Sequence, residues 1–138
     1  MNISNEAQLD RVNIYVNIWS VREIVFYRME SGNCPVEEFL DTLSSKQAQK
    51  VTWVMQLVEE LEIVPVKYFK KMTGTDDLWE IRAQSGNNIF RILGFLEEEY
   101  LVVLNHAFQK KTQKTPKKEI AVAEARKKDH ILRGSRYE

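Results

Sequence analysis

The stretch that decides the fold of this chain is Leu78–Lys118, LWEIRAQSGNNIFRILGFLEEEYLVVLNHAFQKKTQKTPKK. It contains three apolar runs of strand length, which cover Leu78–Gln84, Asn88–Leu96 and Tyr100–Phe108. A turn-forming SGNN segment separates the first two runs, and an acidic EEE turn separates the last two. Consecutive strands joined by such short turns pair in opposite directions. The stretch therefore predicts an antiparallel meander.

The charges of this stretch are mostly basic. Within the three runs Glu80 is accompanied by three basic side chains, Arg82, Arg91 and His106. The segment that follows crowds five lysines into nine positions without any acid: Lys110, Lys111, Lys114, Lys117 and Lys118. Arginines on apolar strands, bordered by a lysine cluster, suit a phosphate-rich partner.

The whole chain has the composition of an ordinary soluble domain, with 138 residues, 43% hydrophobic and 29% charged. We expect a single domain, because the length supports one hydrophobic core but not two. No apolar run approaches the roughly 20 residues of a membrane helix, and the N-terminus does not resemble a signal peptide. Cys34 is the only cysteine, so no internal disulfide is expected, and the cytoplasm is the predicted compartment.

The formal net charge of zero conceals a difference between the halves of the chain. Residues 1–66 carry five Lys and Arg against ten Asp and Glu, whereas residues 67–138 carry fifteen against ten. The second half therefore has the electrostatics of an anion-binding surface. The overall neutrality argues against nonspecific coating of DNA.

Outside the meander, the pattern predicts one strand followed by two helices. Residues 1–20 are interpreted as an N-terminal extension, and Val21–Met29 as the first strand. Pro35 stands where a short amphipathic helix should begin, and a second helix is predicted over Lys46–Ile63, after the capping serines. These two helices form a predicted hairpin on one side of the sheet, with Trp53 assigned to helix packing.

The remaining segments are a connector, a final helix and a tail. The connector, Val66–Thr75, is basic and aromatic. Its lysines come just before the meander and the later lysines come just after it, so both groups could line the same groove. Thr115 is the predicted N-cap of a C-terminal helix of roughly 14 residues, with Pro116 in its first turn. The domain is expected to cover residues 21–133, and residues 134–138 to form a frayed tail.

Several kinds of chemistry lack the residues that they require. The two histidines and one cysteine show no metal-ligand spacing, no serine or cysteine sits in a nucleophile elbow, and the five glycines form no phosphate loop. Neither a metal nor a small-molecule cofactor is expected. A basic site that contains a histidine suffices for cleavage of RNA by its own 2′-OH, because the substrate supplies the nucleophile.

In that reaction the protein supplies cations for the phosphorane and groups that move protons. Arg82 and Arg91 suit the first task, and His106 or a lysine whose pKa is depressed suits the second. Each residue also has a purely structural interpretation. Arg82 could pair with Glu80 or Asp77, Arg91 could face solvent from its strand, and His106 could be a hydrogen-bonded structural histidine.

The order of a strand, a helical hairpin, LWEIR, NIFRILGF, VLNHAFQKKTQKTP and a KKEIAVAEARKK helix resembles the RelE/HigB-type toxins of bacterial toxin–antitoxin pairs, specifically their phage-derived host-killing branch. The resemblance covers about residues 21–133. It implies the small α+β RelE-like toxin fold, with an antiparallel sheet of about four strands, an N-terminal helical hairpin packed on it and a C-terminal helix.

The resemblance also implies a function. Such a toxin is a ribosome-dependent endoribonuclease (an mRNA interferase) of a type II toxin–antitoxin system, and its partners are the ribosome, mRNA and a cognate antitoxin, commonly a helix-turn-helix DNA-binding protein. Arg82, Arg91, His106 and Lys110 match the expected catalytic positions. The lysines expected to contact RNA are Lys67, Lys70, Lys71, Lys111, Lys114, Lys117 and Lys118. Two alternatives remain, a non-enzymatic ParE-like toxin that inhibits DNA gyrase and a degenerate RNA-binding relative.

Overall fold

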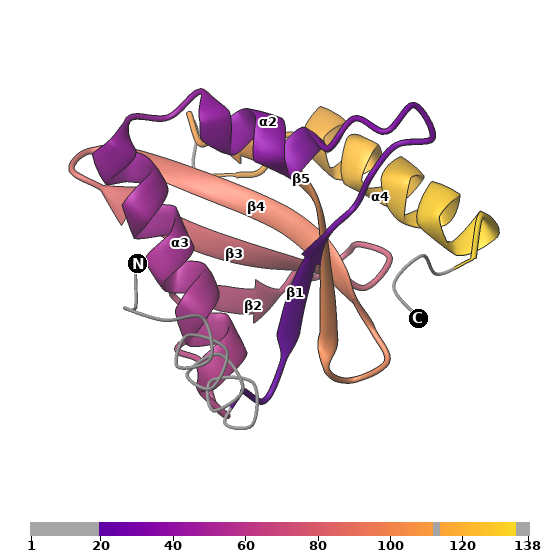
Figure 1. Cartoon of the computed structure of the whole chain (residues 1–138), viewed down its shortest axis with the longest axis horizontal. Helices are drawn as coiled ribbons and strands as arrows, with labels where there is room; N and C mark the ends of the chain where they lie inside the picture. Colours follow the sequence, from indigo (N-terminus) through magenta and orange to yellow (C-terminus); the bar gives the residue numbers. More distant parts are fainter. Residues whose placement is uncertain (1–19, 112–113, 135–138) are drawn as a thin grey trace, which may run out of the picture.

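The computed structural model describes residues 20–111 and 114–134, which form an α+β fold of one sheet and three helices (Figure 1). The strands are β1 (Glu23–Phe26), β2 (Phe69–Lys71), β3 (Leu78–Ser85), β4 (Asn88–Glu97) and β5 (Leu101–Gln109). The helices are α2 (Pro35–Asp41), α3 (Ser45–Glu60) and α4 (Lys117–Leu132). The predicted N-terminal extension and C-terminal tail lie outside the described residues, apart from Ser20 and Gly134.

The sheet is mixed and has the strand order β1-β5-β4-β3-β2. The predicted meander is confirmed, because β3, β4 and β5 pair antiparallel in succession. The predicted antiparallel sheet of about four strands is correct only in part: there are five strands among the described residues, and β1 pairs parallel with β5. The periodicity of a short strand does not reveal the direction of its partner, so the sequence could not distinguish the two pairings.

The fifth strand is β2, which lies inside the segment predicted to be a connector. It is only three residues long and pairs antiparallel with β3 at the edge of the sheet. Phe69 is its only buried residue and stacks on Trp79, with 4.7 Å between the ring centroids. A strand of this length is too short to produce a readable alternation of apolar and polar residues.

Both N-terminal helices pack on one face of the sheet, but a helical hairpin is not confirmed. α2 contacts mainly β5, α3 contacts mainly β3, and the two helices run in clearly different directions in Figure 1. A capping box between Ser44 and Gln47 begins α3. At the other end the Arg22 guanidinium donates to carbonyls of α3 and the loop that follows it, those of Val58, Leu61 and Glu62.

The face under α2 and α3 is apolar. Val51, Val54 and Val58 of α3 are fully buried against strand side chains such as Phe90 and Ile92. The prediction that Trp53 packs inside the helix interface is wrong, because 42% of this residue is exposed. Trp53 lies on the outer side of α3 beside the exposed Thr52, although it directly precedes the buried Val54.

The opposite face is covered only in part, by α4. Leu78, Leu93 and Phe108 form a small apolar cluster with Ala123 of this helix. The predicted helix is confirmed with 16 residues, but its N-cap is Pro116 rather than Thr115 and makes no side-chain cap. The Thr115 hydroxyl instead accepts a hydrogen bond from Arg91, so a residue predicted to begin the helix contacts the strand below it.

Candidate functional site

Arg82 and Arg91 are direct cross-strand partners on β3 and β4. Residues directly opposite in a sheet point to the same side, and this is the side on which α4 packs, since Leu93 and Phe108 share it. Like charges directly opposite each other destabilise a strand pair. A pair of arginines at this position is therefore best satisfied when an anion lies between or above the two guanidinium groups.

One of the two arginines already has an acidic partner. Arg91 Nη1 lies 2.8 Å from Glu80 Oε2, and both residues are buried, with 8% of Arg91 and 1% of Glu80 exposed. The two acids considered as structural partners of Arg82 pair with other residues: Glu80 pairs with Arg91, and Asp77 pairs with Lys71. Among the described residues no carboxylate forms an ion pair with Arg82.

Sequence reasoning missed the role of Glu80. The sequence indicates Glu80 as an acid among basic strand residues and as a possible partner of Arg82, whereas in the structure it pairs with the guanidinium of Arg91 on the neighbouring strand. The signal was present, because Glu80 and Arg82 are two positions apart on β3 and so share a face. The register between β3 and β4, which selects Arg91 as the partner, was not readable.

Lys110 completes the group of cations. It follows β5 directly, and its backbone N–H donates to the Ile89 carbonyl, which continues the pairing with β4. Burial lowers the pKa of Lys110, and the charges of Arg91 and Arg82 lower it further. We call Arg82, Arg91 and Lys110 the cationic triad. A lowered pKa brings the Lys110 amine closer to the range in which it exchanges a proton.

His106 lies on the same side of the sheet but is held by α4. Its Nε2 atom is 2.7 Å from Glu119 Oε1, and its Nδ1 atom is 3.2 Å from Arg126 Nη1. Because an arginine can only donate, Nδ1 is the acceptor and the neutral ring carries its proton on Nε2, directed at Glu119. Burial lowers the pKa of His106, Glu119 raises it and Arg126 lowers it, with a net effect that favours this neutral form.

Three of the predicted RNA-contacting lysines gather at one hollow, which we call the lysine hollow. Lys70, Lys71 and Lys114 line it together with Glu80 and Arg91. Two segments separated by the whole meander thus meet beside the cationic triad. The remaining predicted lysines are exposed at other places: Lys67 before β2, Lys111 after β5, and Lys117 and Lys118 at the start of α4.

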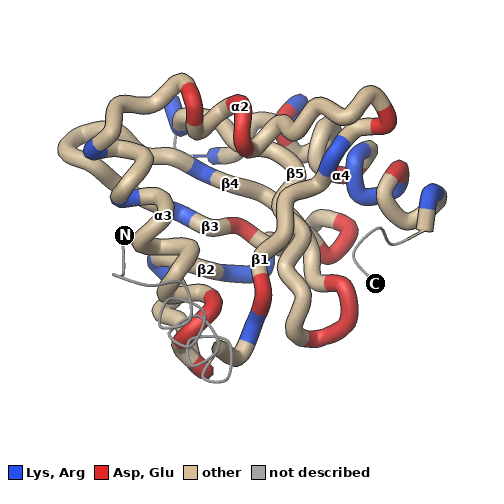
Figure 2. The backbone as a smooth tube through the Cα atoms, in the orientation of Figure 1, with Lys and Arg blue, Asp and Glu red and all other residues tan. Residues whose placement is uncertain are grey.

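The charges are distributed unevenly along the sheet. Basic positions recur on β2, β3 and β4, whereas the turn between β4 and β5 is acidic (Figure 2). The acids there are Glu97 at the end of β4 and Glu98 and Glu99 in the turn. A polyanion approaching the molecule is therefore drawn to the end of the sheet that carries the cationic triad.

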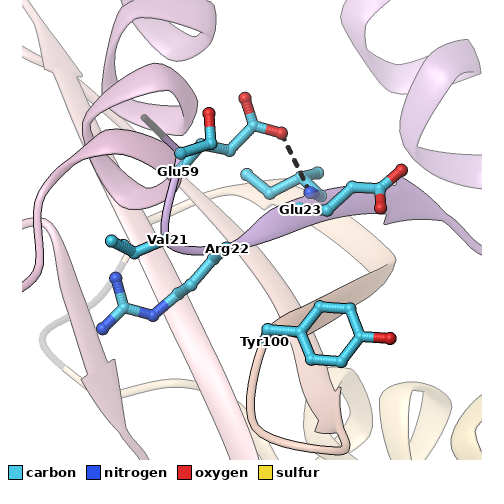
Figure 3. A pocket seen from close by; sticks show the side chains of 7 residues that line it. Val21, Arg22, Glu23, Glu59 and Tyr100 are labelled. Atoms are coloured by element: carbon cyan, nitrogen blue, oxygen red, sulfur yellow. Dashed lines mark hydrogen bonds between the residues drawn. The ribbon is translucent and has the colours of Figure 1, made fainter. Parts of the chain in front are cut away.

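A second hollow lies near the start of β1, and its polar groups serve the fold (Figure 3). The Glu59 carboxylate accepts the backbone N–H of Ile24, and burial raises the pKa of Glu59. Val21 and Arg22 donate their N–H groups to the Glu59 carbonyl. Because these groups already bond to one another, we do not assign this hollow as the functional site.

Residues 20–111 and 114–134 contain no cluster of three or more His, Cys, Asp or Glu that could hold a metal ion. None of the described helices combines the length and the apolar character needed to cross a lipid bilayer.

The fold and the site define a small α+β protein with a cationic sheet face. Comparison with protein families gives a match over residues 38–128 to the family described as phage derived protein Gp49-like (DUF891). The chain therefore belongs to the Gp49-like family, which is a family of RelE-like toxins. No curated protein matches the chain. Membership of a toxin-like family suggests an antitoxin as a partner.

Proposed function

We propose that this chain is the toxin of a type II toxin–antitoxin pair and cuts mRNA on the ribosome. The family membership supports a toxin, and the cationic triad supports a phosphate-containing substrate. The observation that carries the proposal is the direct pairing of Arg82 with Arg91 beside Lys110, whose pKa is lowered. Three cations on one sheet face, with one buried carboxylate among them, form a site for a polyanion.

In the proposed reaction the RNA 2′-oxygen attacks the adjacent phosphorus, and the bond from phosphorus to the 5′-oxygen breaks. The products are a 2′,3′-cyclic phosphate and a free 5′-OH. Arg82 and Arg91 stabilise the charge that develops on the phosphorane oxygens. Lys110 is the best-placed group for proton transfer, because His106 directs its only proton at Glu119.

The ribosome contributes what the site lacks. A site with so few proton-transfer groups gains much of its rate from the alignment of the 2′-oxygen, the phosphorus and the leaving oxygen, and a decoding site holds mRNA in a fixed conformation. The lysines around the triad would engage ribosomal phosphates, and this contribution to affinity falls steeply as the salt concentration rises.

The test is brief induction of the chain in cells without its antitoxin, with 5′ ends of transcripts mapped before and after. We expect growth arrest and new cuts in translated mRNA. Arg82→Ala removes one phosphorane contact and should reduce cleavage about 10²- to 10³-fold. Arg91→Ala should do the same, but it also leaves Glu80 without its partner, so its folding is checked by circular dichroism.

Arg28→Ala is the matched control, because Arg28 is an exposed arginine beyond the end of β1 whose guanidinium donates to the nearby Gly32 carbonyl. It should cut mRNA like the wild type. Unchanged cleavage by folded Arg82→Ala and Arg91→Ala would remove the proposed site. Intact mRNA accompanied by an SOS response would instead identify a gyrase-directed toxin, and intact mRNA with retained RNA binding a degenerate relative.

A further inference from the structure

An aromatic and basic site lies at the β2 edge of the sheet, next to the cationic triad. It is built around a hollow lined by Lys50, Lys67, Tyr68, Arg82, Gln84 and Gly86, which we call the edge hollow. Its volume is about 490 Å³, and no acidic side chain lines it. Arg82 borders this hollow and also belongs to the triad, so the two sites are continuous.

Two aromatic rings stand beside the edge hollow. Trp53 of α3 meets Tyr68 edge to face, with 5.6 Å between the ring centroids and an angle of 89°. Although tryptophan is a costly residue to leave in water, 42% of Trp53 is exposed. The interior of α3 is complete without it, because Val51, Val54, Met55 and Val58 form the buried side of this helix.

A lysine accompanies each ring. Lys50 Nζ lies 4.5 Å from the centre of the Trp53 ring, and Lys67 Nζ lies 4.9 Å from the centre of the Tyr68 ring. These cation–π contacts hold the two ammonium groups at the rim of the hollow. Trp53 is exposed and Tyr68 is half-buried. Accessible rings flanked by cations are an arrangement by which proteins bind single-stranded nucleic acids, since bases stack on the rings and phosphates meet the cations.

We infer that the edge hollow, together with Trp53, binds a single-stranded RNA segment that continues from the cationic triad, with a base stacked on Trp53 or Tyr68 and phosphates at Lys50 and Lys67. The inference rests on the proposed function for the identity of the polyanion. It extends the RNA path from the centre of the sheet around its β2 edge to α3. Charge complementarity and continuity through Arg82 favour RNA over a protein partner, because the site offers no acidic group to a basic peptide.

The experiment measures binding of a labelled single-stranded 2′-deoxy oligonucleotide of about 10 residues to the full chain by fluorescence anisotropy at low salt. This probe lacks the 2′-OH, so it binds without being cut. Trp53→Ala should weaken binding about 5- to 150-fold, the loss expected for one stacked base, and Tyr68→Ala should act in the same direction. Trp53→Phe should restore most of the affinity, because it keeps a stacking surface.

Two further variants sharpen the result. Tyr100→Ala removes an exposed aromatic ring in the turn between β4 and β5, and it should bind like the wild type. Lys50→Ala combined with Lys67→Ala should reduce the slope of the logarithm of affinity against the logarithm of salt concentration by about 0.7 for each lost phosphate contact. Circular dichroism confirms that each variant is folded.

Each other outcome overturns the inference. Absence of binding by the wild type at low salt does so directly, as does equal weakening by Trp53→Ala and Tyr100→Ala. Unchanged oligonucleotide binding by Trp53→Ala, combined with lost capture of the antitoxin, would make the site a protein interface. The proposed function fails separately, because it depends on mapped mRNA cuts and on Arg82→Ala, neither of which requires Trp53.

Discussion

The two faces of the sheet are built from the same strands but bury different chemistry. The face under α2 and α3 buries aliphatic and aromatic side chains in one large cluster that includes Phe90, Ile92 and Val102. The buried charged and polar residues of the described chain are on or against the α4 side: Glu80, Arg91, Asn105 and His130. Asn105, for example, donates to the Ala123 carbonyl of α4.

This difference separates stability from function. Apolar burial is the main favourable term in folding and carries no chemical specificity, so one face can supply it. Buried charges need specific partners and contribute little net stability, but they hold side chains in fixed positions. Because the apolar face supplies the stability, the α4 face can keep paired arginines that a strand pair would otherwise disfavour.

The largest expected effect compares the same residue type on the two faces. Phe90→Ala should lower the free energy of unfolding by about 4 kcal/mol, because it opens a cavity in the main cluster. Phe108→Ala should cost less, about 2 kcal/mol, because Phe108 belongs to the smaller cluster under α4 and is 9% exposed. Urea denaturation measures both values, and equal losses would contradict the division of labour between the faces.

A somewhat smaller effect is expected from the buried ion pair. Glu80→Gln should destabilise the fold by about 3 kcal/mol, because Arg91 then lacks its carboxylate. Arg91→Met alone should cost a similar amount. The double variant should cost clearly less than the sum, since neither charge is then left without its partner. Additive losses in this double-mutant cycle would show that the pair does not act as a unit.

The smallest effect concerns pH and tests whether His106 is neutral under α4. The pKa of His106 is lowered in the folded chain from the ordinary 6.5. Between the two pKa values the unfolded chain binds the extra proton, so stability falls as pH drops below about 6.5. The urea midpoint should therefore decrease from pH 7.5 to pH 5.5 by more in the wild type than in His106→Gln. A larger decrease in the variant would reverse the assignment.

Sequence reasoning could predict what local pattern determines. The meander, the short helix at Pro35 and the final helix each follow from turn residues or periodicity, and the structure confirms them. Arg82 and Arg91 share a face because Ser85 pairs with Asn88 at the turn, a register that the SGNN segment alone does not reveal. β2 and the parallel pairing of β1 were missed, because a three-residue strand has no readable period and pairing direction depends on distant contacts.

The sequence predicts the residue types of the site but not which side chains contact one another. The basic strand positions and the lysine cluster are visible in the sequence, whereas the side chains that bond to Arg91 and His106 come from other elements. Glu119 of α4 accepts the hydrogen bond from His106, and Thr115 accepts one from Arg91. Exposure of Trp53 could not be read either, because the helical pattern allowed it on the margin of the buried stripe.

The parallel pairing of β1 with β5 has a consequence for the timing of synthesis. β1 is made early, but its partner in the sheet begins only at Leu101, after most of the domain has been translated. Such distant pairing makes sheet completion a late and slow step in folding. A growing chain that has not yet exposed β5 also lacks Lys110, so the cationic triad stays incomplete until this late segment of the domain has been made.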